Sequence, residues 1–314
     1  MLQGVRIVVV IPARDEEDHI AEVLSTLPEC VDSAVVVNDG STDQTAQRVS
    51  EAQAPCPVHL LHLDGKGVGA AIDAGHQHHL GALGEPFISV VMAGDGQMNP
   101  DDLTTLVQPI LQGQADHVKG NRMHHEFGLN RMPRHRQVAS KWLGFFTTLA
   151  AGQPFSDPQC GYTATSSTVL RTWDWDRSWK GYGYPNFWLV NLSKAGYRVK
   201  EMPVQSIYRN EVSGIRPPRF FARVGVMLTV EHHRRNLSWL RLRNLTPHTL
   251  FAFIAYMLGW SAFLPFVSND LEQELLARGV PAFVLGLFFW CMAHLFDRGA
   301  ARVHRELRQH APPR

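Results

Sequence analysis

The chain has 314 residues, enough for about two domains with a sizeable buried core. Hydrophobic residues make up 45% of it and charged residues 19%, against a usual charged share of about 25%, which excludes a mainly disordered protein. The net charge of +1 excludes a globally basic protein that binds nucleic acid, so we expect no nucleic-acid partner.

The cysteines and the first residues indicate the compartment. The four cysteines show neither CxxC pairs nor zinc spacing, which argues against a disulfide framework and indicates a reducing environment. Residues 1–6 lead into an apolar run without a charged n-region or a cleavage site, so no secretory signal is expected.

Short apolar runs alternate with amphipathic stretches through the first third of the chain. The apolar runs predict strands at 7–11, 34–37, 59–63 and 87–92, and the amphipathic stretches predict helices at 20–27, 46–49, 67–80 and 103–111. The strands are continuously apolar, as expected when helices cover both faces of a parallel sheet. The fold class is therefore α/β, built from βαβ crossovers.

One helix start places a loop at the binding edge of this sheet. Asn99 is the expected N-cap and Pro100 the first helical residue. Residues 94–98 then lie just after a strand, at the carboxyl edge where open α/β sheets bind ligands.

The last seventy residues differ in kind. Two uncharged runs, 248–267 and 280–296, are long enough to be read as helices that cross about 30 Å of hydrocarbon. Arginines flank both runs and the link 268–279 is acidic, so the positive-inside rule predicts both flanks in the cytoplasm and the link outside. We expect an integral membrane protein of the cytoplasmic or inner membrane, with a lipid bilayer as partner. The alternative is a buried helical hairpin in a soluble domain.

A basic segment before these runs has the spacing of an interfacial helix. Its apolar residues are Phe220, Phe221, Val224, Met227 and Leu228, and its basic residues are Arg219, Arg223 and those at 232–235. Such a helix is expected to lie on an anionic lipid surface.

Three loops after the early strands carry polar residues. They are Pro12-Ala13-Arg14-Asp15-Glu16-Glu17, Asn38-Asp39-Gly40-Ser41-Thr42-Asp43 and Ala93-Gly94-Asp95-Gly96-Gln97-Met98. For the first two loops, a structural role in starting a helix or forming a turn explains the polar residues as well as ligand binding does. In the third, Asp95 and Gln97 can both present oxygens to a hard cation, Mg²⁺ or Mn²⁺, as a diphosphate leaving group would require.

Taken together, these loops and the Gly65-Lys66-Gly67 turn resemble the family 2 glycosyltransferases with the GT-A fold for nucleotide-diphospho-sugars. Within that family the likeness is to dolichol-phosphate mannosyltransferase and the bacterial polyprenyl-phosphate glycosyltransferases, over about residues 5–216. The resemblance implies a donor pocket formed by Pro12, Ala13, Arg14, Glu16, Asp39, Lys66, Gly94 and Asp95. It also implies that Asp95 and Gln97 hold the metal.

The resemblance extends to residues for the acceptor and the leaving group. It implies that Arg122, Arg136 and Ser140 bind the acceptor phosphate, that residues 157–162 close the site, and that Arg209 binds the diphosphate. Arginine side chains suit these roles because they bind phosphate oxygens in pairs.

Two departures from the family pattern are visible. Ala93 stands where the metal signature usually has its first Asp, and residues 212–216 replace a Gly-x-Ser-Lys element, with Arg216 as a candidate for the missing charge. Histidines at 76, 78, 79, 124 and 125 lack metal-ligand spacing and are interpreted as surface residues.

The expected function is inverting transfer of mannose, glucose or an N-acetylhexosamine from a nucleotide diphosphate to an undecaprenyl or dolichyl phosphate. The alternatives are transfer to a glycan or glycolipid hydroxyl, with Asp157 as base, and a non-catalytic membrane scaffold with a degraded metal site. The expected regions are a GT-A catalytic domain at 1–216, a basic juxtamembrane region at 217–246, the two membrane helices within 247–297 and a basic cytoplasmic tail at 298–314. A homo-oligomer is an open possibility.

Overall fold

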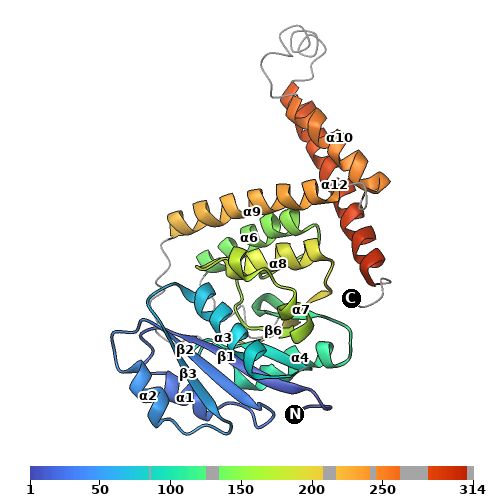
Figure 1. Ribbon diagram of the computed structural model, residues 1–314. Coiled ribbons are helices and arrows are strands. Elements are labelled where there is room, and N and C mark those ends of the chain that lie inside the picture. The colour runs from blue at the N-terminus through green and yellow to red at the C-terminus, as the bar shows by residue number, and fades with distance from the viewer. Residues whose placement is uncertain (85, 125–133, 208–216, 241–244, 262–281, 310–314) are drawn as a thin grey trace.

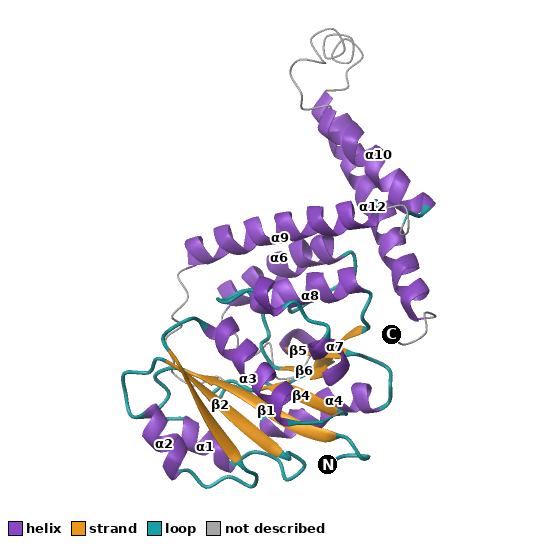
Figure 2. Cartoon of the chain, viewed as in Figure 1, coloured by secondary structure: helices purple, strands orange, loops and turns teal. Residues whose placement is uncertain are grey.

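The structure is a computed structural model that describes residues 1–84, 86–124, 134–207, 217–240, 245–261 and 282–309. A seven-stranded sheet forms its base, and the helices α6 (Arg134–Ala151), α8 (Tyr184–Ala195) and α9 (Pro217–Trp239) lie in layers above one face (Figures 1 and 2). Helices α10 (Pro247–Ser261) and α12 (Ala282–Gln309) lie side by side and project away from these layers.

The sheet has the order β3-β2-β1-β4-β6-β5-β7. Its strands are β1 (Arg6–Ala13), β2 (Ser33–Asp39), β3 (Val58–Leu63), β4 (Phe87–Val91), β5 (His117–Asn121), β6 (Thr163–Ser166) and β7 (Val199–Pro203). β6 runs antiparallel to both of its neighbours, and the other strands all run the same way. The chain turns from β1 toward β3 on one side and places β4 on the other, so the β1–β4 boundary is the switch point at which such sheets bind ligands.

The helices cover both faces of the sheet. They are α1 (Ile20–Ser25), α2 (Thr45–Glu51), α3 (Val68–Ala82), α4 (Leu103–Leu111), α6 (Arg134–Ala151), α7 (Ser167–Arg171), α8 (Tyr184–Ala195), α9 (Pro217–Trp239), α10 (Pro247–Ser261) and α12 (Ala282–Gln309). Short 3₁₀ turns are η1 (Pro100–Asp102), η2 (Arg122–His124) and η3 (Trp175–Arg177). In β1, Val9 packs toward α1 and α4, whereas Val8 and Val10 pack toward the helices of the opposite face. The prediction of a mostly parallel α/β sheet covered on both faces is therefore confirmed.

The predicted elements of the first third are also confirmed, within one or two residues at most ends. The helix at 103–111 matches α4. The Asn99 side chain accepts a hydrogen bond from the backbone N–H of Asp101, as an N-cap does, and Pro100 begins η1.

The prediction of two membrane-spanning helices is wrong. α10 has 15 residues, a length of about 22 Å, and residues 262–281 lie outside the described part of the chain. In α12 the uncharged part ends at Asp297, and Arg298 and Arg302 follow. Among the described residues, no helix combines the length and the apolar character needed to cross a bilayer. This finding overturns the expectation of an integral membrane protein and the topology built on it.

The segment expected on a lipid surface packs partly against protein instead. Val224, Met227 and Leu228 of α9 are buried in the core formed with α6 and α8. Arg235, expected to be available for lipid, has no exposed surface. Its guanidinium pairs with Asp297 of α12 and donates to the backbone oxygen of Ala150 at 2.8 Å.

The interpretation of the histidines as surface residues is wrong at two positions. His76 and His79 are each 1% exposed, on the face of α3 toward the sheet. The Nδ1 atom of His76 lies 2.9 Å from the hydroxyl of Ser89, and burial lowers the pKa of His76 to about 3, so the ring is neutral at physiological pH. His125 lies outside the described residues, and His124 is exposed.

A loop after η3 closes over the first turn of α3. The backbone oxygen of Lys180 accepts from the N–H of Ala70 at 3.1 Å. Asp73, also on α3, accepts from the Lys180 ammonium at 2.8 Å and from the Ser178 hydroxyl at 2.9 Å. Burial raises the pKa of Asp73, and these two partners oppose that shift. The approach is so close that a Cβ atom at Gly69 would lie 2.1 Å from the backbone oxygen of Trp179.

This contact makes two glycines of one helix respond oppositely to alanine. Gly69→Ala should destabilise the protein by about 1–3 kcal/mol, because the added methyl must push the loop away. Gly81→Ala, where a Cβ would meet nothing within 4 Å, should stabilise it by up to about 1 kcal/mol, as alanine does in an open helical position. Urea unfolding of the two variants measures both effects. Equal free-energy changes would contradict the packing described.

Candidate functional site

The first two polar loops are joined to each other by hydrogen bonds. The carboxylate of Asp15 accepts from the backbone N–H of Thr42 at 2.7 Å, and the N–H of Asp15 donates to the Ser41 hydroxyl at 3.0 Å. The N–H of Glu16 donates to the buried hydroxyl of Thr45 at 2.8 Å. Asp15 has a φ of 55°, a strained value for a residue with a side chain. The end of β1 is therefore fixed against the end of β2.

Asp39, at the end of β2, fixes the glycine-rich turn that follows β3. Its two carboxylate oxygens accept from the backbone N–H groups of Lys66 and Gly67, each at 2.7 Å, and the residue is 4% exposed. Gly40 must be glycine here, since its φ is +72° and a Cβ would lie 2.9 Å from the nitrogen of Gly65. The structure thus brings Asp39 and Lys66 together, with the Arg14 guanidinium beside Gly65.

The candidate metal turn lies at the same edge, after β4. The backbone N–H of Gly94 donates to the oxygen of Pro12 at 3.1 Å, which places the turn against the end of β1. Within it, the Asp95 carboxylate accepts from the N–H of Gln97 at 3.0 Å. The backbone oxygen of Gln97 accepts from Ile207 at 2.9 Å, so the turn also reaches the segment after β7.

The donor atoms of this turn limit what it can bind. Asp95 supplies one carboxylate and Gln97 one amide oxygen, and Ala93 supplies no side-chain oxygen. No group of three His, Cys, Asp or Glu side chains suited to a metal ion occurs among the described residues. The set fits a hard cation held jointly with a diphosphate, because a cation of this kind prefers more oxygens than two side chains provide.

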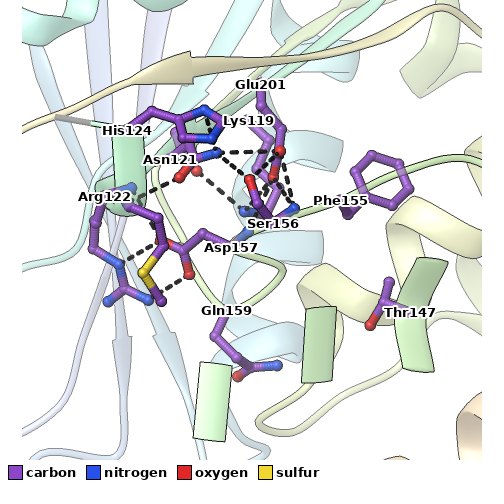
Figure 3. Close-up of polar contacts among 12 residues, drawn as sticks. Lys119, Asn121, Arg122, His124, Thr147, Phe155, Ser156, Asp157, Gln159 and Glu201 are labelled. Atoms are coloured by element: carbon purple, nitrogen blue, oxygen red, sulfur yellow. Dashed lines mark hydrogen bonds and ion pairs between the residues drawn. The ribbon is translucent and has the colours of Figure 1, made fainter. Parts of the chain in front are cut away.

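Arg122 follows β5 and is held by a buried carboxylate (Figure 3). Its Nε and Nη2 atoms each donate to Asp157 at 2.8 Å, and its backbone N–H donates to the same carboxylate at 3.0 Å. Asp157 has no exposed surface, whereas the Arg122 side chain is 20% exposed. Burial alone would raise the pKa of Asp157, but the charge and hydrogen bonds of Arg122 outweigh it and lower the pKa to about 2.

The segment that begins with Asp157 continues toward the metal turn. The Tyr162 hydroxyl donates to the backbone oxygen of Asn99 at 3.1 Å. The backbone oxygen of Tyr162 accepts from the backbone N–H of Gly120 at 2.8 Å. Gln159 donates to Asn186 of α8. Residues 157–162 therefore form the wall between the metal turn and the end of β5.

The remaining expected residues are only partly described. Ser140 lies on α6 and is 7% exposed. Arg136 lies on the same helix, but its side chain is outside the described residues, as is all of Arg209. Arg216 and the altered element at 212–216 also lie outside them.

The sequence patterns missed two charged residues behind Arg122. Lys119 on β5 has no exposed surface, and Glu201 on β7 lies opposite it in the sheet register. Burial alone reveals them in the structure, because lysine and glutamate are rarely buried unless they are paired. Asp157 was assigned to the closing segment and, in one alternative, to a base, but not to a pair with Arg122.

The fold and the sequence resemble those of known proteins. The fold matches the crystal structure of glucosyl-3-phosphoglycerate synthase from Mycobacterium tuberculosis in complex with Mn²⁺, UDP and phosphoglyceric acid, with a TM-score of 0.53 at 21% identity, over 73% of this chain and 79% of that one. This likeness supports the predicted GT-A-like fold.

Curated relatives share more of the sequence. A UDP-N-acetylglucosamine–dolichyl-phosphate N-acetylglucosaminyltransferase of Methanococcus voltae is 29% identical over 64% of this chain and 86% of that protein. An undecaprenyl-phosphate mannosyltransferase of Micrococcus luteus is 29% identical over 65% of this chain and 84% of that protein. The family model described as glycosyl transferase family 2 matches residues 8–174. With the site at the carboxyl edge of its sheet, the chain belongs to glycosyl transferase family 2 and is a glycosyltransferase.

Proposed function

We propose that the protein transfers a sugar, with inversion, from a nucleotide diphosphate to a polyprenyl phosphate. The names of the two relatives support this acceptor, since one acts on dolichyl phosphate and the other on undecaprenyl phosphate. The observation that carries the proposal is the pair of Arg122 and Asp157. A buried carboxylate fixes the guanidinium at the sheet edge, which suits the binding of a phosphate oxygen.

The reaction needs no strong protein base. A phosphate monoester is largely ionised at pH 7, because its second pKa is about 6, so an acceptor oxygen can attack the anomeric carbon directly. The new bond joins that oxygen to the carbon, and the bond between the carbon and the donor diphosphate breaks with its electron pair on the diphosphate. In-line attack places the two oxygens on opposite faces of the sugar, which gives inversion.

The state of Asp157 argues against a hydroxyl acceptor. A hydroxyl must lose its proton, and Asp157 was the first candidate to take it. Its pKa of about 2 makes it a weak base, and both of its oxygens accept hydrogen bonds from Arg122. The phosphate acceptor agrees better with this arrangement.

The donor lies, in this proposal, across the ends of β1, β2 and β4. Arg14, Glu16 and Lys66 surround the nucleotide, together with Pro12, Ala13, Asp39 and Gly94. Asp95 and Gln97 would hold Mg²⁺ or Mn²⁺, which supplies positive charge against the departing diphosphate. The Mn²⁺ and UDP in the synthase of similar fold support this assignment.

The acceptor lies, in this proposal, along the start of α6. Arg136 and Ser140 bind its phosphate with Arg122, and Arg209 binds the diphosphate of the donor. Trp142, Phe145 and Phe146 follow on α6, are 49–60% exposed and contact one another through their rings. This apolar stripe suits an isoprenoid chain. Contact with a bilayer and self-association stay predictions from the sequence.

Transfer assays test the acceptor class. The protein is incubated with labelled UDP-N-acetylglucosamine, UDP-glucose or GDP-mannose and with undecaprenyl phosphate in detergent. We expect label from one donor in an organic-extractable lipid that mild acid hydrolyses, because the product is a glycosyl phosphate ester. Undecaprenol, which lacks the phosphate, is the matched control and should accept nothing. Transfer to undecaprenol, or to glycan hydroxyls alone, would refute the proposal.

The candidate metal site, which has one carboxylate fewer than the family pattern, gives a second test. Transfer should require Mg²⁺ or Mn²⁺, and Asp95→Asn should abolish it, since no other described carboxylate of the turn can replace that ligand. Mn²⁺ titrations followed by calorimetry should show measurable binding only when nucleotide diphosphate is present. Ala93→Asp should tighten Mn²⁺ binding without a matching rise in turnover, because a stronger ground-state contact need not stabilise the transition state. Full activity in excess chelator would remove the metal from the account.

A further inference from the structure

We propose that Glu201 is a positioning residue for the acceptor site, a role that rests on the proposed function of Arg122. Glu201 lies on β7, and the contacts described below join it to Lys119, Asn121, Ser156 and Asp157. It accepts hydrogen bonds from the backbone of the segment that carries Asp157, the residue that binds the Arg122 guanidinium (Figure 3).

The contacts of Glu201 converge on that segment. Its carboxylate accepts from the backbone N–H of Ser156 at 3.1 Å and from the N–H of Asp157 at 3.2 Å. It also accepts from the Ser156 hydroxyl at 2.8 Å and from the amide of Asn121 at 3.2 Å. Two consecutive backbone N–H groups on one carboxylate fix the direction of the chain at Asp157.

Asn121 closes the arrangement from the side of β5. Its amide donates to the Ser156 hydroxyl at 2.6 Å, and its side-chain oxygen accepts from the backbone N–H of Met123 at 2.9 Å. Asn121 therefore holds the backbone just after Arg122, while Asp157 holds the Arg122 side chain. Both of these holding residues bond to Glu201.

Charge explains why this residue is a glutamate. Lys119 is fully buried, and its ammonium lies 3.9 Å from the Glu201 carboxylate and 3.1 Å from the backbone oxygen of Gly120. From the interior to the edge of the sheet, the charged groups thus follow the order Lys119, Glu201, Asp157 and Arg122. Two of these groups are positive and two are negative. Glutamine at 201 would keep the shape, but it would present an N–H group where acceptors are needed and leave Lys119 without its counter-ion.

The test observes the Arg122–Asp157 pair directly and without substrate. In protein labelled with ¹⁵N-arginine, NMR measures how fast the Nε–H proton of Arg122 exchanges with water, and Arg122→Lys assigns the signal. Glu201→Gln should speed this exchange by about tenfold or more, because the proton loses its fixed carboxylate acceptor. In transfer assays the same variant should raise the KM for the acceptor by a similar factor and leave the KM for the donor unchanged.

The opposite ends of the same two strands offer a matched control. Asp116 accepts from the Arg198 backbone N–H at 2.8 Å and from its Nε atom at 3.0 Å. Asp116→Asn should therefore speed exchange at Arg198 Nε–H and leave Arg122 Nε–H as in the wild type. A merely structural loss at the β5–β7 pair would change both variants alike.

The outcomes separate the two claims. Unchanged exchange at Arg122 in Glu201→Gln, or equal acceleration at Arg122 in Asp116→Asn, overturns the positioning role. If Glu201→Gln does not fold, the double variant Lys119→Met/Glu201→Gln, which removes both charges, carries the same expectation. If Arg122 loses protection in the variant but the wild-type protein transfers no sugar to undecaprenyl phosphate, the proposed function fails and the positioning role stands.

Discussion

The site depends on one buried carboxylate. Asp157 has no exposed surface, so its charge is stable only because the guanidinium and the backbone N–H of Arg122 donate to it. In return, Arg122 has two of its N–H groups fixed in direction before any ligand arrives. These two bonds fix the plane of the guanidinium, so its other N–H donors lose little entropy when a charged ligand binds, which suits a side chain at a sheet edge to act on a phosphate.

The fold brings the two halves of the proposed site, a donor half and an acceptor half, to one edge of the sheet. Loops after β1, β2, β3 and β4 form the donor half, and Asp39 and Asp15 join them through backbone N–H groups. The ends of β5 and β7 form the acceptor half. The antiparallel strand β6 lies between β4 and β5, so residues 157–162 enter it at this same edge and separate the two halves. The Gln97–Ile207 bond links them again.

Local patterns predicted the local structure and failed where distant partners decide. The apolar run of β1 and the cap at Asn99 are set by neighbours in sequence, and both were predicted. The Arg122–Asp157 pair joins residues 35 positions apart, and no spacing reports it. The uncharged runs near the C-terminus were assigned to membrane from their length and their flanking arginines, but where the helices begin and end in the fold cannot be read from an apolar run. In the structure Gly259 of α10 packs so closely on Trp290 of α12 that a Cβ would lie 2.2 Å away.

The central claim is that Arg122, fixed by Asp157, binds the acceptor phosphate. Calorimetric titration of farnesyl phosphate and of farnesol into the protein tests it without catalysis. We predict that the wild type binds the phosphate more tightly than the alcohol. Arg122→Lys keeps the charge but loses the planar guanidinium that Asp157 orients, and it should weaken phosphate binding by about tenfold, or about 1.4 kcal/mol. Arg198→Lys, at the matched pair with Asp116, should bind it like the wild type. Equal affinity of the wild type and Arg122→Lys for farnesyl phosphate would contradict the account.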